Sequence, residues 1–342
     1  MPDGARTSTV TRRPADPRRR LGRAVIVVAV LVVIVLIALG VRTFGGEVKQ
    51  LANDVVHLGT PSTNGTPLDP SAFASGACMS FPPTSGNNGK TVFLDAGHGG
   101  LDPGGVGTTE SGQTVYESTV NLAIELDAMA ILRAEGYRVV VSRTADTTVL
   151  KLGPADTDGQ LLSLQGSHDD VVARDQCANL AKADALIGIY MDAGGIDQAG
   201  SVTLYDTDRT FSQENTTLAG LLQTDVLAAM NAQGWQIPND GSLPDSGFGS
   251  SAGDPASGGL AAEAAAYNHL LLIGPAMSGY FSTPSQMPGA VIEPLYLTDP
   301  FEGSIAVNPA DQEIIATGIA SAVERFLMPT TGSVQPSATA PA

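Results

Sequence analysis

Basic residues, histidine and cysteine are all scarce in this chain of 342 residues. It holds 18 lysine and arginine residues against 35 acidic ones, with four histidines and two cysteines, and its formal net charge at pH 7 is −17. Such an acidic chain repels nucleic acid and anionic lipid, so we exclude both as partners. The sequence also lacks a Cys-x-x-Cys pair, a phosphate-binding loop and a Ser-His-Asp set at motif spacing. These absences exclude the zinc-finger, nucleotide-binding and serine-hydrolase classes.

Long hydrophobic runs are also rare, and the clearest lies near the start of the chain. Residues 24–41 contain no charge and no proline, and a helix of this length covers about 27 Å, enough to span a bilayer. Residues 1–23 hold seven arginines and two acidic residues, which predicts a cytoplasmic N-terminus and an extracytoplasmic domain facing the cell wall. A cleavable signal peptide is the alternative, although the run is long for one and no clear small-x-small cleavage site follows.

The regions that flank the central part of the chain are rich in turn-forming residues. We expect residues 42–88 to form an extracytoplasmic linker and residues 329–342 a disordered tail. Cys78 and Cys177 both follow the predicted membrane span, on the side where oxidation is permitted. The sequence is compatible with a disulfide between them and equally with two free buried thiols.

Between these limits, strand patterns alternate with helical patterns. We expect strands at residues 92–94, 137–142, 185–190, 201–205, 269–274 and 290–295, and helices at residues 117–133, 171–182, 217–232 and 311–327. This alternation predicts a single α/β domain with a mostly parallel central sheet and helices on both faces, preceded by one transmembrane helix. Residues 235–268 are rich in Gly, Ser, Pro and Ala, which is typical of a lid, a binding loop or a disordered insertion.

The densest group of unusual residues is Asp95-Ala-Gly-His-Gly-Gly-Leu-Asp-Pro-Gly104, directly after an apolar strand. Glycine on both sides of His98 permits unusual backbone angles and the close approach of another group. The carboxyl ends of parallel strands are where α/β domains usually carry their chemistry. The motif resembles the opening motif of the zinc-dependent N-acetylmuramoyl-L-alanine amidases, which cleave bacterial peptidoglycan. The resemblance extends, with gaps, over residues 89–328.

This resemblance implies one zinc ion held by three side chains, with a glutamate as general base. His98 matches the first ligand, and Glu117 matches the second at the start of the following helix; both residue types are ordinary zinc donors. Glu293 matches the catalytic base, since it ends an apolar strand where a carboxylate is costly to bury unless it is functional or paired. The structural alternatives are a helix-dipole role for Glu117 and an ion pair of Glu293 with Arg143 or Arg174.

The third zinc ligand departs from the family pattern. The family has a histidine in a Ser-x-His-x-Asp/Asn motif at the end of a strand, and the corresponding residue here is Tyr190. Tyr190 as a phenolate and Asp192 are both possible third donors. Another histidine is a further possibility, which leaves His57, His168 and His269 as candidates.

Three further residues are expected to support the site. Asp102 is predicted to fix the His98 loop or to orient a ligand from behind. Arg143 and Arg174 stand where family members carry arginines. Each is expected to bind a carboxylate of the peptidoglycan stem peptide or to pair with an acidic side chain.

Two functions are compatible with these residues. The resemblance implies a membrane-anchored peptidoglycan hydrolase that uses zinc to cleave the amide between N-acetylmuramic acid and L-alanine in cell-wall turnover. The alternative is a catalytically inactive protein of the same fold that binds peptidoglycan or regulates a cell-wall hydrolase. A third nitrogen or oxygen donor beside His98 and Glu117 would favour the enzyme.

Overall fold

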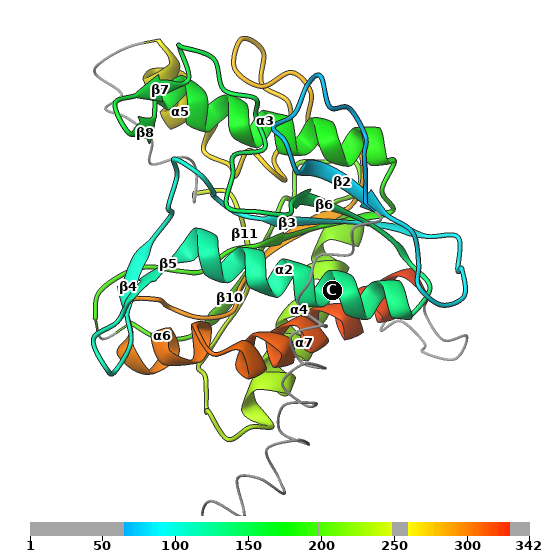
Figure 1. Ribbon diagram of the computed structural model, residues 1–342, viewed down its shortest axis with the longest axis vertical. Helices are drawn as coiled ribbons and strands as arrows, with labels where there is room; N and C mark the ends of the chain where they lie inside the picture. The colour runs from blue at the N-terminus through cyan, green and yellow to red at the C-terminus, as the bar shows by residue number, and fades with distance from the viewer. Residues whose placement is uncertain (1–64, 197, 248–258, 329–342) are drawn as a thin grey trace, which may run out of the picture. The chain divides into compact units, whose positions relative to one another are not determined.

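An eight-stranded sheet runs through the described part of the computed structural model, which comprises residues 65–196, 198–247 and 259–328 (Figure 1). The strand order is β1-β2-β6-β3-β9-β12-β10-β11. The four inner strands β6 (Arg138–Arg143), β3 (Thr91–Ala96), β9 (Ala185–Ile189) and β12 (Gly289–Glu293) run parallel to their neighbours in this set. The predicted α/β fold with a mostly parallel sheet is therefore confirmed.

The predicted membrane span at residues 24–41 and the tail at residues 329–342 lie outside the described residues. Within the described residues, no helix is long and apolar enough to cross a membrane.

The inner strands are continuous apolar runs because helices cover both of their faces. Successive side chains of a strand point to opposite faces. Val92 and Leu94 of β3 accordingly pack in one hydrophobic core, and Phe93 packs in the other. All three side chains are fully buried. The sheet thus separates two cores and gives the strand ends a rigid frame.

Helices α2 (Glu117–Ala134), α4 (Ser212–Asn231) and α7 (Pro309–Leu327) cover one face of the sheet. Helices α3 (Leu164–Ala181) and α5 (Leu260–Tyr267) lie on the other face (Figure 1). The four helices expected from the sequence are confirmed, with ends that differ by a few residues, and α5 is an addition to them. Ser163 caps α3, its hydroxyl accepting a hydrogen bond from the Gly166 N–H at 3.0 Å.

At the first edge of the sheet, part of the expected linker at residues 42–88 forms two strands instead. Residues Thr66–Pro67 form β1 and Ala77–Phe81 form β2, which pairs antiparallel with β6. The five residues of β2 lie between Gly76 and Pro82-Pro83, so turn formers dominate the surrounding sequence and mask the strand. Cys78 of this strand is joined to Cys177 of α3 by a disulfide with a Cα–Cα distance of 5.6 Å, which decides between the two alternatives for the cysteines.

At the opposite edge of the sheet, part of the expected insertion at residues 235–268 forms a strand. β10 (Ser201–Tyr205) pairs antiparallel with β12, and β11 (Asn239–Pro244), from within residues 235–268, pairs parallel with β10. The strand expected at residues 269–274 is wrong. The N–H groups of Ile273 and Gly274 both donate to the carbonyl of Leu270, so this segment is a turn that satisfies its own backbone groups.

The remaining short elements surround the carboxyl ends of the inner strands or lead into α3. They are the hairpin of β4 (Val106–Thr108) and β5 (Thr114–Tyr116), the hairpin of β7 (Thr157–Asp158) and β8 (Leu161–Leu162), and α6 (Pro300–Ala306). Asp299 caps α6 by accepting a hydrogen bond from the Glu302 N–H at 2.9 Å, with Pro300 in the first turn.

Candidate active site

Three predicted residues converge at the carboxyl ends of the inner strands. His98 follows β3, Glu293 ends β12, and Glu117 begins α2. His98 has a φ of 61°, a left-handed conformation that is uncommon for residues with a side chain and concentrates at functional sites. At Gly104, a Cβ atom would lie 2.7 Å from both Glu117 Oε2 and His98 Cδ2. Only glycine therefore lets the loop close over this pair.

The imidazole of His98 is held between two carboxylates. Its Nδ1 lies 2.7 Å from Asp102 Oδ2, and its Nε2 lies 3.3 Å from Glu117 Oε2. Asp102 also accepts a hydrogen bond from the Gly104 N–H at 3.1 Å, so it fixes both the loop and the ring. Burial on its own would lower the pKa of His98, but the hydrogen bonds to Asp102 and Glu117 outweigh it and raise that pKa to about 10.

Glu117 is buried and fixed by backbone donors. Its Oε1 accepts a hydrogen bond from the Met191 N–H at 3.0 Å, and its Oε2 accepts one from the Gly105 N–H at 2.7 Å. Burial opposes the charged form, yet His98 and these two N–H groups keep the pKa of Glu117 below its ordinary value. The carboxylate is therefore ionised and oriented toward His98.

Glu293 lies within electrostatic reach of the same pair. Burial, followed by the charges of Asp192 and Glu117, raises the pKa of Glu293 to about 8, and His98 acts in the opposite direction. The charges of Asp192, Glu117 and His98 therefore all act on the carboxyl group of Glu293. Glu293 does not form the predicted alternative ion pair, since the ion pairs of Arg174 in the described residues are with Asp95 and Asp170.

Arg143 and Arg174 are both buried behind the His98 loop. Arg174 donates to the His98 carbonyl at 2.7 Å and to Asp95 Oδ1 at 2.8 Å. Arg143 donates to the Gly97 carbonyl at 3.1 Å. With exposures of 0% and 1% respectively, Arg143 and Arg174 position the loop and present no free guanidinium to a peptide carboxylate.

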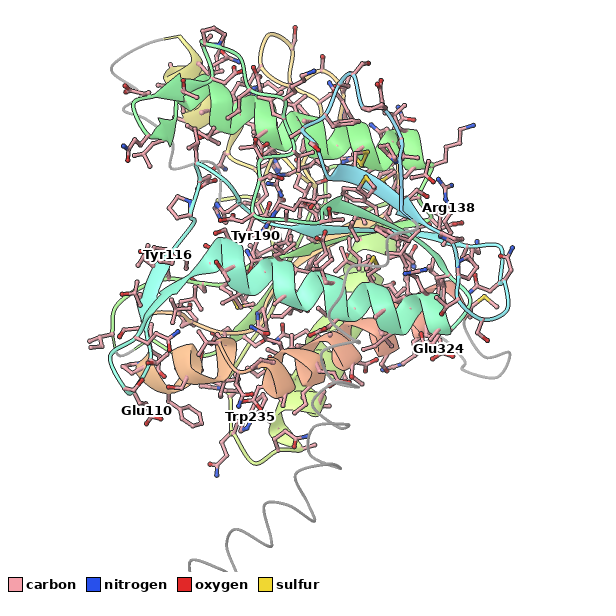
Figure 2. All side chains as sticks on the ribbon, viewed as in Figure 1. Glu110, Tyr116, Arg138, Tyr190, Trp235 and Glu324 are labelled. Atoms are coloured by element: carbon pink, nitrogen blue, oxygen red, sulfur yellow. A yellow bond between two sulfur atoms is a disulfide. The ribbon has the colours of Figure 1, made fainter. Side chains whose placement is uncertain are left out.

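Tyr190 packs flat against the same loop. A Cβ atom at position 97 would lie 2.3 Å from its ring, so Gly97 is required for this contact. The Tyr190 hydroxyl donates to Asp95 Oδ2 at 3.1 Å, and burial together with the Asp95 charge raises the pKa of Tyr190 well above its ordinary value. The centroid of its ring lies 5.5 Å from that of the His98 ring. In Figure 2, Tyr190 and Tyr116 of the β4–β5 hairpin lie toward the same end of the sheet. In this structure the Tyr190 hydroxyl is therefore held by Asp95.

A cavity of about 280 Å³ opens beside this group. His98, Asp102, Arg174, Tyr190 and Glu293 line one part of it. Residues of α3 and of the segment after α5 provide a mainly apolar wall, which consists of Leu164, Ser167, His168, Asp170, Val171, His269, Leu270, Leu271, Leu272, Tyr280 and Val291. A concave, largely apolar site with a few convergent polar groups is typical of an enzyme.

Residues 92–325 match the sequence profile of the family described as N-acetylmuramoyl-L-alanine amidase. The chain belongs to this amidase family. It is 29% identical over 146 residues to the uncharacterized protein YqiI of Bacillus subtilis, covering 42% of this chain and 58% of that one. It is 30% identical over 106 residues to the germination-specific N-acetylmuramoyl-L-alanine amidase of the same organism, covering 31% and 40%. The chain therefore matches less than two thirds of the length of either relative.

A solved structure of the CwlD amidase from Clostridioides difficile, in complex with the GerS lipoprotein, shares the fold. The two align with a TM-score of 0.50 at 20% identity, covering 70% of this chain and 98% of that one.

The donor set of this amidase domain fits a divalent cation. Two ligands of one zinc ion at about 2.1 Å lie about 3.4 Å apart, and His98 Nε2 and Glu117 Oε2 are separated by 3.3 Å. Asp102 bonds to Nδ1 of His98, so Nε2 is the ring nitrogen that faces Glu117 and can bind a metal ion, as in carboxylate–histidine–zinc arrangements. The charges of Asp192 and Glu117 also oppose ionisation of Glu293, and a cation held by His98 and Glu117 would offset this repulsion.

The other histidines of the amidase domain are engaged elsewhere. His168 bonds through Nε2 to the Tyr280 carbonyl at 3.0 Å and through Nδ1 to Asp169 at 2.8 Å. His269 contacts Asp206 and Asp245, and His57 lies outside the described residues. The hydrogen bonds of His168 and His269 thus hold them away from the role of third ligand.

One residue of the site escaped the sequence analysis. Asn121 donates through Nδ2 to the Gly97 carbonyl and to Glu117 Oε1, both at 3.3 Å. It lies one helical turn after Glu117 on the buried face of α2. Its spacing of four positions from a predicted ligand was the available signal.

Proposed function

We propose that this chain is a membrane-anchored, zinc-dependent N-acetylmuramoyl-L-alanine amidase that hydrolyses the amide between N-acetylmuramic acid and L-alanine in cell-wall turnover. The observation that carries the proposal is the facing pair of His98 Nε2 and Glu117 Oε2, 3.3 Å apart, within electrostatic reach of Glu293. Membership of the amidase family supports the reaction type.

His98 and Glu117 would hold the zinc, and Asp192 is our candidate for the third protein donor. The charge of Asp192 raises the pKa of Glu293, as does the charge of Glu117, and His98 lowers it. Tyr190 is the weaker candidate, because its hydroxyl already donates to Asp95. When bound, zinc would polarise the scissile carbonyl and lower the pKa of the attacking water.

Glu293 would move the proton during hydrolysis. Its carboxylate would accept a proton from the attacking water and return it to the nitrogen of the leaving L-alanine. A general base works best when its pKa lies near the working pH, and burial beside two other carboxylates raises the pKa of Glu293 to about 8. A cation held by the neighbouring ligands would lower this value toward neutrality.

The expected span at residues 24–41, with the arginines before it, would anchor the domain to the cell membrane and direct it toward peptidoglycan. Residues after the span would then lie outside the membrane. Detection of the full-length protein in the membrane fraction, and its release when residues 1–41 are deleted, is the matching test.

The test of the reaction is release of new α-amino groups of L-alanine from purified peptidoglycan by the full-length protein. Glu293→Gln should lower the rate at least about 100-fold, because the proton acceptor is lost while the shape is kept. A chelator should abolish the activity, and added zinc should restore it. The exposed Glu110→Gln variant is a control that should keep the wild-type rate. Equal hydrolysis by Glu293→Gln, or activity that survives the chelator, would refute the proposal.

A second candidate is favoured by the sequence resemblance, in which Tyr190 corresponds to the position of the family's third zinc ligand. On this alternative, the domain binds peptidoglycan or regulates another hydrolase without cleaving the substrate. Retention of the protein on insoluble peptidoglycan with no release of amino groups, with and without zinc, would favour this candidate over the enzyme.

A further inference from the structure

A second group of metal-ligating side chains lies apart from the candidate active site. Asp206 and Asp245 are fully buried, and His269 is nearly so. One potential ligand atom from each of the three lies within 4.8 Å of the other two. Neither carboxylate was a candidate in the sequence, because the three residues are far apart along the chain and β11 was not predicted.

The topology of the sheet explains why these residues meet. Asp206 directly follows β10 and Asp245 directly follows β11. These strands are parallel, with Tyr205 paired with Pro244, so the two aspartates emerge side by side. His269 reaches them from the segment after α5.

The same topology separates this group from Glu293. β10 runs antiparallel to β12, with Val202 opposite Glu293 and Leu204 opposite Val291. Asp206 therefore lies at the end where β12 begins, and Glu293 lies where it ends. The five residues of β12 put the two positions about 13 Å apart along the strand.

The distances within the group match those between ligands of one ion. His269 Nδ1 lies 3.1 Å from Asp206 Oδ2 and 3.2 Å from Asp245 Oδ1. Two donors bound to one ion at about 2.1 Å with tetrahedral angles are about 3.4 Å apart. The other ring nitrogen, His269 Nε2, lies 3.7 Å from the exposed carboxylate of Asp208. Metal-binding histidines commonly face a carboxylate on their second nitrogen.

One oxygen in the group has no hydrogen bond that would account for its burial. Asp206 Oδ2 is inaccessible to solvent and accepts no hydrogen bond of good geometry within the described residues. The other oxygens are used: Asp206 Oδ1 accepts from the Asp208 N–H at 2.9 Å and Asp245 Oδ2 from the Leu270 N–H at 3.0 Å. The polar neighbour of Asp206 Oδ2 is His269 Nδ1 at 3.1 Å, and two buried carboxylates beside one imidazole are costly unless a cation balances them.

The nearest guanidinium is directed to other partners. Arg209 donates to the carbonyls of Ile273 and Gly274 at 3.1 Å and to Ser285 Oγ at 3.2 Å. The charge of Arg209 also acts on Asp206 and Asp245. A protonated His269 could complete the balance of the two carboxylates without a metal ion, and the experiment separates this outcome from metal binding.

We propose that Asp206, Asp245 and His269 form a second site, which binds a divalent first-row transition metal of the zinc or manganese kind. One nitrogen and two carboxylate oxygens suit these ions better than calcium, which prefers six to eight oxygen ligands. The ion would fasten the ends of β10 and β11 to the segment after α5. Because His269 and Leu270–Leu272 line the cavity, the ion would also fix the apolar wall of that cavity.

The test uses the full-length protein carrying His98→Ala, so that metal at the candidate active site does not contribute. The protein is equilibrated separately with zinc and with manganese, and bound metal is counted by elemental analysis. About one equivalent of at least one metal should remain after dialysis. At about 100 times the dissociation constant, that metal should raise Tm by about 5–10 °C.

Asp206→Asn and His269→Gln, each added to His98→Ala, should abolish both the bound metal and the rise in Tm. His168→Gln is the matched control, because His168 lines the same cavity but bonds to the Tyr280 carbonyl, and this variant should keep both effects. If Asp206→Asn does not fold, His269→Gln alone decides the question.

The inference is overturned if the His98→Ala protein retains neither metal, which leaves protonated His269 as the balancing cation. It is also overturned if Asp206→Asn or His269→Gln, in the folded state, keeps the bound metal. The proposal does not depend on amidase activity, so its failure and that of the proposed function are distinguishable.

Discussion

At the scale of single residues, the proposed zinc site would link the protonation of His98 to metal binding. Its ring lies between Asp102 and Glu117, and its pKa is raised to about 10 in the metal-free chain. The proton on Nε2 must leave before that nitrogen can bind zinc, so zinc and the proton compete.

This competition predicts that zinc affinity rises with pH. Between pH 6 and pH 8, both below the pKa of His98, each unit of pH should strengthen binding at least about tenfold. Chelator-competition titrations at pH 6, 7 and 8, on a His269→Gln background that removes the second proposed site, provide the measurement. Affinity that stays constant across this range would show that His98 is not a ligand.

Tyr190 illustrates a side chain whose role depends on its hydrogen bond. Tyr190→Phe removes the hydroxyl that donates to the fully buried Asp95. It should lower the free energy of unfolding by about 1–3 kcal/mol, because an acceptor is left buried with one donor fewer. Urea unfolding of the two proteins measures the difference. Tyr116→Phe is the control at a tyrosine that is 49% exposed, and it should change stability by less than about 0.5 kcal/mol. Equal effects of the two substitutions would contradict this account.

The sequence predicted those site residues that local patterns mark. His98 stands in a glycine-rich loop after a strand, Glu117 at a helix start, and Glu293 at the end of an apolar strand. The roles of Arg143 and Arg174 could not be predicted, because burial in the folded domain decides whether each guanidinium can reach a substrate. Only the folded chain shows that Arg143 donates to backbone carbonyls, and that Arg174 donates to backbone carbonyls and pairs with buried acids.

At the scale of secondary-structure elements, the inner strands were predictable because helices cover both faces and leave an uninterrupted apolar run. β2, which lies next to the short edge strand β1, and the edge strand β11 were not predictable. β2 lies between glycine and proline residues, and β11 has the sequence Asn239-Asp-Gly-Ser-Leu-Pro244, with a single apolar side chain before the proline. Pairing with a neighbouring strand, rather than local pattern, makes these segments strands.

The disulfide between Cys78 of β2 and Cys177 of α3 joins one of these strands to a helix of the domain. Cys78 and Cys177 are separated by 99 positions in sequence, and cross-links over long separations strongly restrict the unfolded chain. Replacement of both by serine should lower the free energy of unfolding by about 2–5 kcal/mol, measured by urea unfolding under oxidising conditions. Reduction of the wild-type protein should produce a similar loss. An unchanged stability in both experiments would mean that the bond does not form or does not contribute.

At the scale of the whole molecule, buried acids set the response to pH. Burial is the leading cause that raises the pKa of Glu125 and of Glu293 to about 8, and that of Glu302 to about 7. For each group the folded-state value exceeds the ordinary value near 4.5. The folded protein therefore binds more protons than the unfolded chain between about pH 4.5 and pH 8.

The metal-free protein should accordingly lose stability as the pH rises from 5 to 8.5. Glu125→Gln should flatten this loss, because its side chain cannot ionise while the Ala96 and Ser142 N–H groups keep an acceptor. Urea unfolding at both pH values, with a chelator present, measures the two slopes. A wild-type protein that gains stability over this range, or a variant with the wild-type slope, would contradict the assignment.

In the zinc site that we propose, His98 and Glu117 hold the ion and Asp192 is the third protein donor. The most direct measurement is the zinc content of the full-length protein by elemental analysis, compared among wild type, His98→Ala, Asp192→Ala and Tyr190→His. The account predicts that His98→Ala and Asp192→Ala each lose one equivalent of zinc per chain and that Tyr190→His gains none. Zinc content that His98→Ala leaves unchanged, or that rises by one equivalent only in Tyr190→His, would contradict it and identify a site disabled by the tyrosine.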